Sequence, residues 1–64
     1  MMEQYQTIIL SRDLNPVIKK GMIGVVLEVW SETSFEVEFA REDGTHYEFK
    51  GQYTFTIDKS FIKI

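Results

Sequence analysis

Strict alternation of apolar and charged residues marks the middle of this chain. In FEVEFA, residues 35–40, the phenylalanines and the valine fall on one side of an extended backbone and the glutamates on the other. This is the period-two pattern of a half-buried strand. The pattern returns in THYEF, residues 45–49, and the dipeptide Asp43-Gly44 between the two segments is typical of a tight turn. The pattern therefore predicts a β-hairpin over residues 35–49.

The segment IGVVLEVW, residues 23–30, predicts the strand before this hairpin, joined to it by the polar turn SETS at 31–34. Its β-branched residues suit a pleated, half-buried surface. Ile23 is expected to enter the core. Alternation divides the following residues between two faces, a core face with Val25, Leu27 and Val29 and an outer face with Val26, Glu28 and Trp30.

The flanking segments predict further strands and a terminal turn. QTIIL at 6–10 is a short first strand, and YTFTI at 53–57 resumes the alternation after a bulge or kink at Gly51. The last residues, DKSFIKI at 58–64, predict a one-turn or 3₁₀ helix followed by a short final pairing.

The segment SRDLNPVIKK, residues 11–20, predicts an irregular loop. Pro16 disfavours helical backbone at the residue before it, and Leu14 and Ile18 are expected to pin the loop to the core. Residues 1–64 are therefore predicted to form one all-β domain. It is a small barrel of about five antiparallel strands, with a long loop after the first strand and a short 3₁₀ turn before the last.

The stretch KKGMIGVV, residues 19–26, has glycines spaced as in some phosphate-binding loops. A P-loop or a dinucleotide-binding turn needs a helix after its glycines, whereas here Val25 begins a run suited to a strand. GMIG also matches the Gly-x-x-Gly loop of KH domains, but no helix is predicted around it. The glycines are therefore assigned structural roles. Gly21 permits a turn with positive φ, and Gly24 lets the backbone cross closely over a neighbouring strand.

The order DLN…IKKGMIGVVLEVW…FEVEFAREDGT resembles a family of short bacterial domains of unknown function with SH3-like barrel folds. The matching residues are Asp13, Leu14, Lys19 or Lys20, Gly21, Gly24, Val26, Glu28, Val29, Val37, Glu38, Phe39 and Gly44. The turn Lys-x-Gly-x-x-Gly-x-Val is also similar to that of KOW-type barrels. The resemblance implies an SH3-like barrel and brings no activity with it, since the family has none established.

Composition narrows the chemistry that the chain can perform. The 64 residues carry a formal charge of −3, with no cysteine and one histidine, which leaves no disulfide framework and no ordinary zinc site. His46 is expected to be a solvated residue near the hairpin tip, because no serine and acid are spaced around it as in a catalytic triad. No catalytic residue, cofactor or metal ligand is assigned, and the chain is predicted not to be an enzyme.

The aliphatic run Ile8–Leu10 is too short for a signal peptide or a membrane span, so a cytoplasmic protein without membrane contact is expected.

Two features are candidates for a binding surface. Trp30 falls on the outer face of its strand, where an exposed aromatic is a candidate contact anchor; the alternative is that the strand bends and Trp30 caps the barrel end. The second feature is an acidic face that comprises Glu28, Glu36, Glu38 and Glu48, with Glu32 and Glu42 in the flanking turns. Such a face steers a basic partner or only keeps the protein soluble. A further alternative is loose binding of a divalent ion by Glu36, Glu38, Glu48 and His46.

These features favour a non-enzymatic protein–protein interaction module. One variant is an immunity or antitoxin-like protein whose acidic face masks a basic nuclease or toxin surface. The alternative is KOW-like nucleic-acid binding, which the acidic charge disfavours and which requires the basic residues to gather on one side. Those residues are Arg12, Lys19, Lys20, Arg41, Lys50, Lys59 and Lys63. A monomer and a homodimer formed by strand addition at an open barrel edge are both compatible with the sequence.

Overall fold

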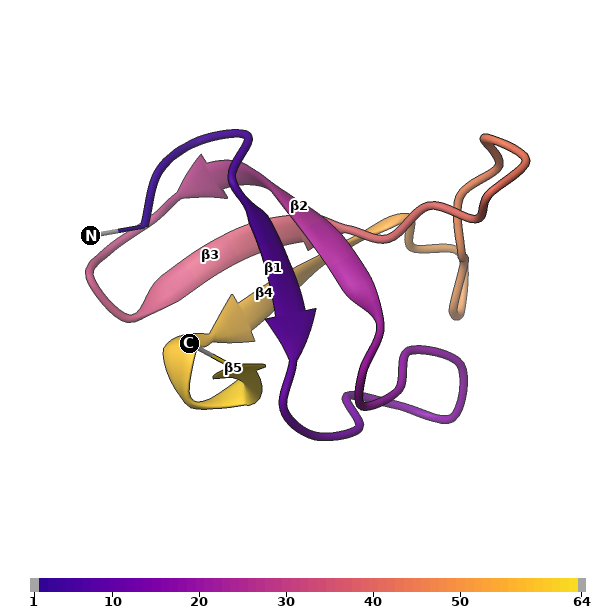
Figure 1. The fold of residues 1–64 in the computed structure, drawn as a ribbon, viewed down its shortest axis with the longest axis horizontal. Helices are drawn as coiled ribbons and strands as arrows, with labels where there is room; N and C mark the ends of the chain where they lie inside the picture. The colour runs from indigo at the N-terminus through magenta and orange to yellow at the C-terminus, as the bar shows by residue number, and fades with distance from the viewer. Residues whose placement is uncertain (1, 64) are drawn as a thin grey trace.

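The computed structural model describes residues 2–63, which form a single curled antiparallel sheet (Figure 1). Its elements are β1 (Thr7–Leu10), β2 (Ile23–Val29), β3 (Ser34–Glu38), β4 (Thr54–Asp58), the 3₁₀ helix η1 (Lys59–Phe61) and β5 (Ile62–Lys63). The strand order is β4-β3-β2-β1-β5, so that the last strand returns to pair with the first. The predicted all-β fold, a small SH3-like barrel with one 3₁₀ turn before its last strand, is confirmed.

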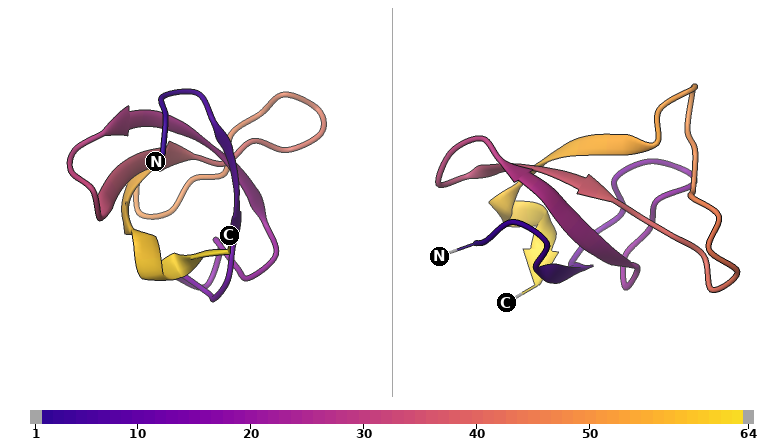
Figure 2. Two further views of the ribbon diagram at one scale, coloured as in Figure 1. Left: turned by 60° about the vertical axis from the view of Figure 1, so that its left-hand side comes forward. Right: turned by 90° about the horizontal axis from the view of Figure 1, so that it is seen from above.

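The strands wrap around a common interior, as two further views show (Figure 2). η1 carries the chain from β4 across to β5, where Ile62 lies opposite Leu10 of β1. The side chain of Asp58 caps η1 by accepting the N–H of Ser60 at 2.8 Å. The interior is filled by apolar side chains, namely Ile8, Leu10, Ile18, Val26, Phe35, Val37, Phe39, Phe55, Ile57 and Ile62.

The long loop between β1 and β2 is irregular, as predicted, and its own side chains fold it. The side-chain oxygen of Asn15 accepts the N–H groups of Val17 at 2.9 Å and Ile18 at 2.8 Å. This turn directs the fully buried Ile18 into the core. Gly21 has φ +89°, which confirms the turn with positive φ before β2.

A bulge in β2 makes the predicted division of its faces wrong before Leu27, whereas Glu28, Val29 and Trp30 after it lie on the predicted sides. Val26 lies opposite Val37 and Glu28 opposite Glu36, which leaves Leu27 as an extra residue between the two pairs. The extra residue inverts the alternation. Val26 is fully buried before the bulge, and Val29 packs against the core after it.

The start of β2 differs from the prediction for the same reason. Ile23 is not in the core but 59% exposed on the outer face, since the core side of this segment belongs to Gly24 and Val26. Gly24 is buried there, and a Cβ built on it would come within 2.6 Å of a Val37 methyl carbon and 2.7 Å of the Phe39 ring. The predicted close crossing at Gly24 is confirmed.

The predicted hairpin over residues 35–49 is wrong in its second strand. β3 pairs along its length with β4, with Phe35 opposite Ile57 and Val37 opposite Phe55. Residues 39–53 are instead an excursion built from two tight turns. The N–H of Arg41 donates to Thr45 at 2.6 Å in the first, and the second turns at Lys50 and Gly51, both with positive φ. The pairing with β4 prevails because it buries Phe55 and Ile57, whereas the aromatic residues of 45–49 are only partly buried.

Substitution of Gly24 by alanine tests the close crossing of β2 over β3. The added methyl group meets Val37 and Phe39, so the free energy of unfolding is expected to fall by about 1–3 kcal/mol. Urea denaturation measures the change. The neighbouring substitution Ile23→Thr is the matched control and should cost less than about 1 kcal/mol, because Ile23 lies outside the core. A larger loss in Ile23→Thr than in Gly24→Ala would contradict this arrangement.

Candidate functional site

Trp30 follows directly after β2 and projects from the sheet with 60% of its surface exposed. Its backbone N–H donates to the carbonyl of Ser34 at 2.9 Å, which anchors it at the start of the turn into β3. The indole Nε1–H donates to Oε1 of Glu36 at 3.1 Å. Trp30 is therefore an exposed side chain held in one orientation, and it does not cap the barrel interior.

Glu36 is the centre of a hydrogen-bonded cluster on the outer sheet face, which we call the Trp30–Glu36 cluster and which also contains Thr54 and Thr56. The hydroxyl of Thr56 donates to Glu36 Oε1 at 2.7 Å, and that of Thr54 donates to Oε2 at 2.7 Å. Partial burial raises the pKa of Glu36, but the hydrogen bonds from Thr56, Thr54 and Trp30 together bring the pKa below its ordinary value of 4.5. The carboxylate is therefore ionised at neutral pH, as its role as acceptor of three hydrogen bonds requires.

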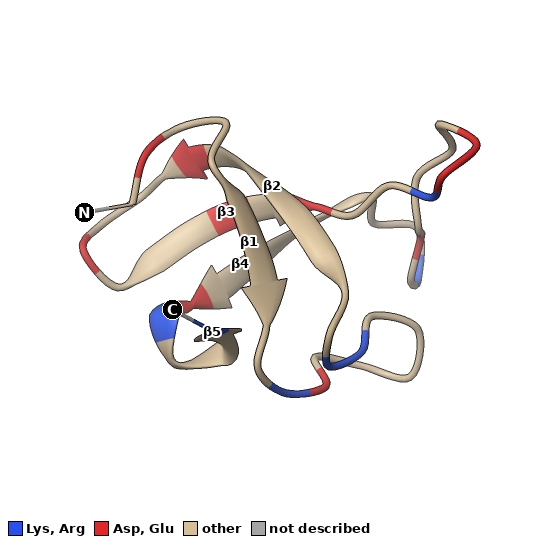
Figure 3. Ribbon diagram, viewed as in Figure 1, with Lys and Arg blue, Asp and Glu red and all other residues tan. Residues whose placement is uncertain are grey.

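The predicted acidic face is divided in the structure (Figure 3). Glu28 lies directly opposite Glu36 across β2 and β3, so these two carboxylates share one row of the outer face. Glu38 is on the same face of β3, but its carboxylate is 3.2 Å from Nε2 of His46. Glu48 belongs to the 39–53 excursion and lies outside the strands. The structure therefore brings together Trp30, Glu28 and Glu36, and separates Glu48 from them.

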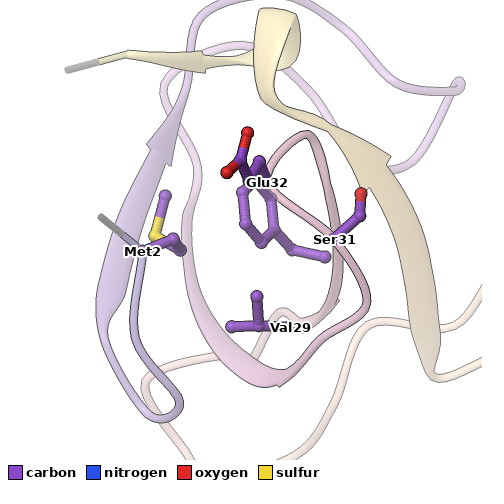
Figure 4. A pocket seen from close by; sticks show the side chains of 5 residues that line it. Met2, Val29, Ser31 and Glu32 are labelled. Carbon is purple, nitrogen blue, oxygen red and sulfur yellow. The ribbon is translucent and has the colours of Figure 1, made fainter.

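An apolar hollow of about 240 Å³ opens beside the β2–β3 turn (Figure 4). Its lining residues are Met2, Val29, Ser31, Glu32 and Phe35. Val29 and Phe35 are opposite each other on the inner side of the sheet, whereas Trp30 lies on the outer side at the same end of the hairpin. Binding pockets for drug-sized ligands span about 300–1,000 Å³, so this hollow has room for a single side chain. Sequence reasoning missed it because only the curl of the sheet brings Met2 to residues 29–35.

Two further apolar side chains are exposed at the opposite end of β2. Ile9 and Ile23 face each other across β1 and β2 and are 41% and 59% exposed. Beside them, a second hollow of about 230 Å³ lies between the Gly21–Ile23 segment and the excursion, where the guanidinium of Arg41 stacks 4.2 Å above the ring of Tyr47. The sequence did not predict this exposed pair, Ile9 and Ile23, because Ile23 was expected to lie in the core.

His46 is placed where the sequence predicted it, exposed beside the turn of the excursion. Its backbone forms an isolated antiparallel β-bridge with Ala40, and its imidazole Nε2 lies 3.2 Å from the carboxylate of Glu38. Within residues 2–63, no group of three or more His, Cys, Asp or Glu side chains is arranged to hold a metal ion. No helix in the same part of the chain is long and apolar enough to cross a membrane.

Comparison with known proteins adds no family to this description. No protein-family model matches the chain, and the searches of curated proteins and of solved structures also give no match.

Acidification is expected to release the indole of Trp30 from Glu36. Because the pKa of Glu36 is lowered in the folded chain, the stability that this carboxylate contributes is present above its unfolded pKa. It is lost as the pH falls through the folded value. The ¹H–¹⁵N resonance of Trp30 Nε1–H should therefore shift with a midpoint below pH 4.5.

Two substitutions control this titration. Glu36→Gln should abolish the shift, whereas Glu42→Gln, in the first turn of the excursion, should leave the midpoint unchanged. A midpoint that persists in Glu36→Gln would assign the titration to another group.

Proposed function

We propose that the chain is a non-enzymatic protein-interaction module that binds its partner with the end of the β2–β3 hairpin. The observation that carries this proposal is that Trp30 is exposed and yet oriented by its hydrogen bond to Glu36. Tryptophan is among the residues that dominate binding energy at interfaces. A side chain that is already ordered in the free protein also loses less conformational entropy on binding.

The chemistry around this hairpin end favours a basic partner with an apolar side chain to insert. Glu28 and Glu36 lie on the outer face beside Trp30, and Glu32 lines the hollow on the other side. The whole chain carries a formal charge of −3, and a negative charge steers the approach of a cationic surface. An immunity or antitoxin-like protein that masks a basic nuclease or toxin surface is the form of this function that the charge supports.

Replacement of Trp30 by alanine tests the proposal. The exposed indole contributes little to folding, so the free energy of unfolding is expected to change by less than about 1 kcal/mol. Partner binding should weaken at least about tenfold, as for an interface hot spot. The measurement is affinity capture from the source cells with the purified chain, followed by titration of the captured protein.

The matched control is Tyr53→Ala, because Tyr53 is a similarly exposed aromatic residue at 56% that lies outside the hairpin end. Binding that survives in Trp30→Ala, or that is lost equally in both variants, would contradict the assigned surface. Glu28→Lys reverses a charge and keeps Glu36, the hydrogen-bond acceptor of the indole. It should weaken the binding of a basic partner more at low salt than at high salt.

Nucleic-acid binding is the second candidate, because most basic residues gather at the end of the barrel away from Trp30. Ser11 donates its N–H to the carbonyl of Phe61 at 2.8 Å, which joins the loop after β1 to η1. The loop carries Arg12, Lys19 and Lys20, and Lys63 lies opposite Ile9 of β1. Lys59 is separate from them, because its N–H donates to the carbonyl of Thr33 in the β2–β3 turn. The acids among them, Asp13 and Asp58, accept backbone N–H groups of Lys20 and Ser60. This end therefore presents the positive charge that a phosphate backbone needs.

A gel-shift assay with labelled RNA and DNA at low salt separates the two candidates. The protein-interaction proposal predicts no shift, since the net charge is negative and phosphate binding is strongest under these conditions. A shift that disappears in the double variant Lys19→Glu, Lys20→Glu would favour the nucleic-acid function instead.

A further inference from the structure

The edge of the sheet formed by β4 has free backbone hydrogen-bonding groups. β4 is the last strand in the order β4-β3-β2-β1-β5 and pairs only with β3. The other edge belongs to β5, which spans two residues. β4 is thus the one edge of this sheet, within residues 2–63, that is long enough to pair over several residues.

The direction of each backbone group in β4 follows from the alternation along β3. The carbonyl of Ser34 accepts the N–H of Trp30 on the β2 side, and the carbonyl of Phe39 accepts the N–H of Tyr47 on the other side. Because N–H and C=O groups alternate sides along a strand, Phe35 and Val37 face β4. Their partners Ile57 and Phe55 face back toward β3.

The N–H and C=O groups of Thr54, Thr56 and Asp58 therefore point outward from the sheet. None of the three residues takes part in the other backbone hydrogen bonds formed by residues 2–63. β4 also lacks the features that usually protect an edge, since TFTID has no lysine, no proline and no register shift against β3. The edge is a ready template for another strand.

We propose that β4 pairs with β4 of a second copy of this chain, antiparallel about a two-fold axis at Thr56. In this register Thr56 faces Thr56 of the partner subunit, and Thr54 faces Asp58 of the partner subunit. All three outward-facing residues of each strand then meet outward-facing residues, which gives about six backbone hydrogen bonds. A register moved by two residues leaves an outward-facing residue of each β4 outside the paired strands.

The side chains of β4 fit a second copy better than an arbitrary strand. The inner face would place Phe55 against Ile57 of the partner subunit, so that buried apolar residues of both cores meet at the joint. On the outer face, the single charge of the strand, Asp58, would face a threonine and not another carboxylate. Like charges directly opposite each other destabilise a sheet, and this register avoids them. Two-fold dimers are also the commonest symmetric assemblies.

The dimer would align the two Trp30–Glu36 clusters in one row. Glu36 lies opposite Thr56 across β3 and β4, so the two Glu36 residues would be separated by three strand spacings, about 14 Å. Both Trp30 side chains would then lie on the same face of one continuous sheet. The dimer does not depend on the proposed function of Trp30, but it would make any binding at this site bivalent.

Sedimentation velocity across micromolar to millimolar concentrations tests the proposal. The wild-type chain should change with concentration from its 7.5 kDa monomer to a species of twice that mass. Thr56→Pro removes the N–H donors at the axis and the hydroxyl bond to Glu36. It removes none of the backbone hydrogen bonds between β4 and β3, because the backbone groups of Thr56 face outward. It should raise the dimer dissociation constant at least about tenfold. Thr56→Val keeps the N–H and should leave the dissociation constant within a few-fold of the wild-type value.

Amide hydrogen exchange identifies the paired edge and confirms that the variant folds. In the wild-type dimer, the amides of Thr54, Thr56 and Asp58 should be protected. In Thr56→Pro, Thr54 and Asp58 should lose protection while Phe55 and Ile57, bonded to β3, keep it. If Thr56→Pro does not fold, Thr56→Lys serves instead, since it opposes like charges at the axis and keeps the backbone. A wild-type chain that stays monomeric at millimolar concentration would overturn the proposal, as would a dimer that neither substitution weakens.

Discussion

The structure depends on the close contact of β2 with the side chains of β3 at Gly24. The absence of a Cβ at this position lets Val37 and the ring of Phe39 pack directly against the backbone of β2. β2 pairs with β1 on one side and β3 on the other, so this contact lies in the central strand of the sheet. At the start of β2, Gly24 and Val26 therefore lie on the inner side of the sheet, and Ile23 lies on the outer side.

The bulge at Leu27 then reverses the alternation of inward and outward side chains along β2. This reversal decides which side chains of the hairpin end are exposed. Glu28 turns outward to lie opposite Glu36, and Val29 turns inward opposite Phe35. The next residue, Trp30, is left on the outer face, within reach of the carboxylate on β3. One extra residue thus produces both the exposed indole and the apolar wall of the hollow on the other side of the same hairpin.

Three strand segments contribute to the Trp30–Glu36 cluster, and each supplies a different group. The indole comes from the end of β2, the carboxylate from β3 and two hydroxyls from β4. A carboxylate that accepts several hydrogen bonds remains charged without a cationic partner. The cluster therefore combines an ordered aromatic surface with fixed negative charge. The basic residues lie elsewhere, on η1, β5, the loop after β1 and the 39–53 excursion (Figure 3).

The sequence by itself determined the class of fold and the position of its loop. It also singled out Trp30, but left open whether this side chain is exposed or caps the barrel end. Alternation in 35–39, the β-branched run of β2 and the Pro16 turn act over a few residues, so they can be recognised without knowing the partners of each strand. Tertiary structure alone decided that β3 pairs with β4 and not with 45–49, that β2 bulges at Leu27, and that Glu36 gathers two threonines. These outcomes depend on pairing between distant segments, where burial of Phe55 and Ile57 outweighs a local turn. Alternation specifies the faces of a strand, but only its neighbours decide which face is inside.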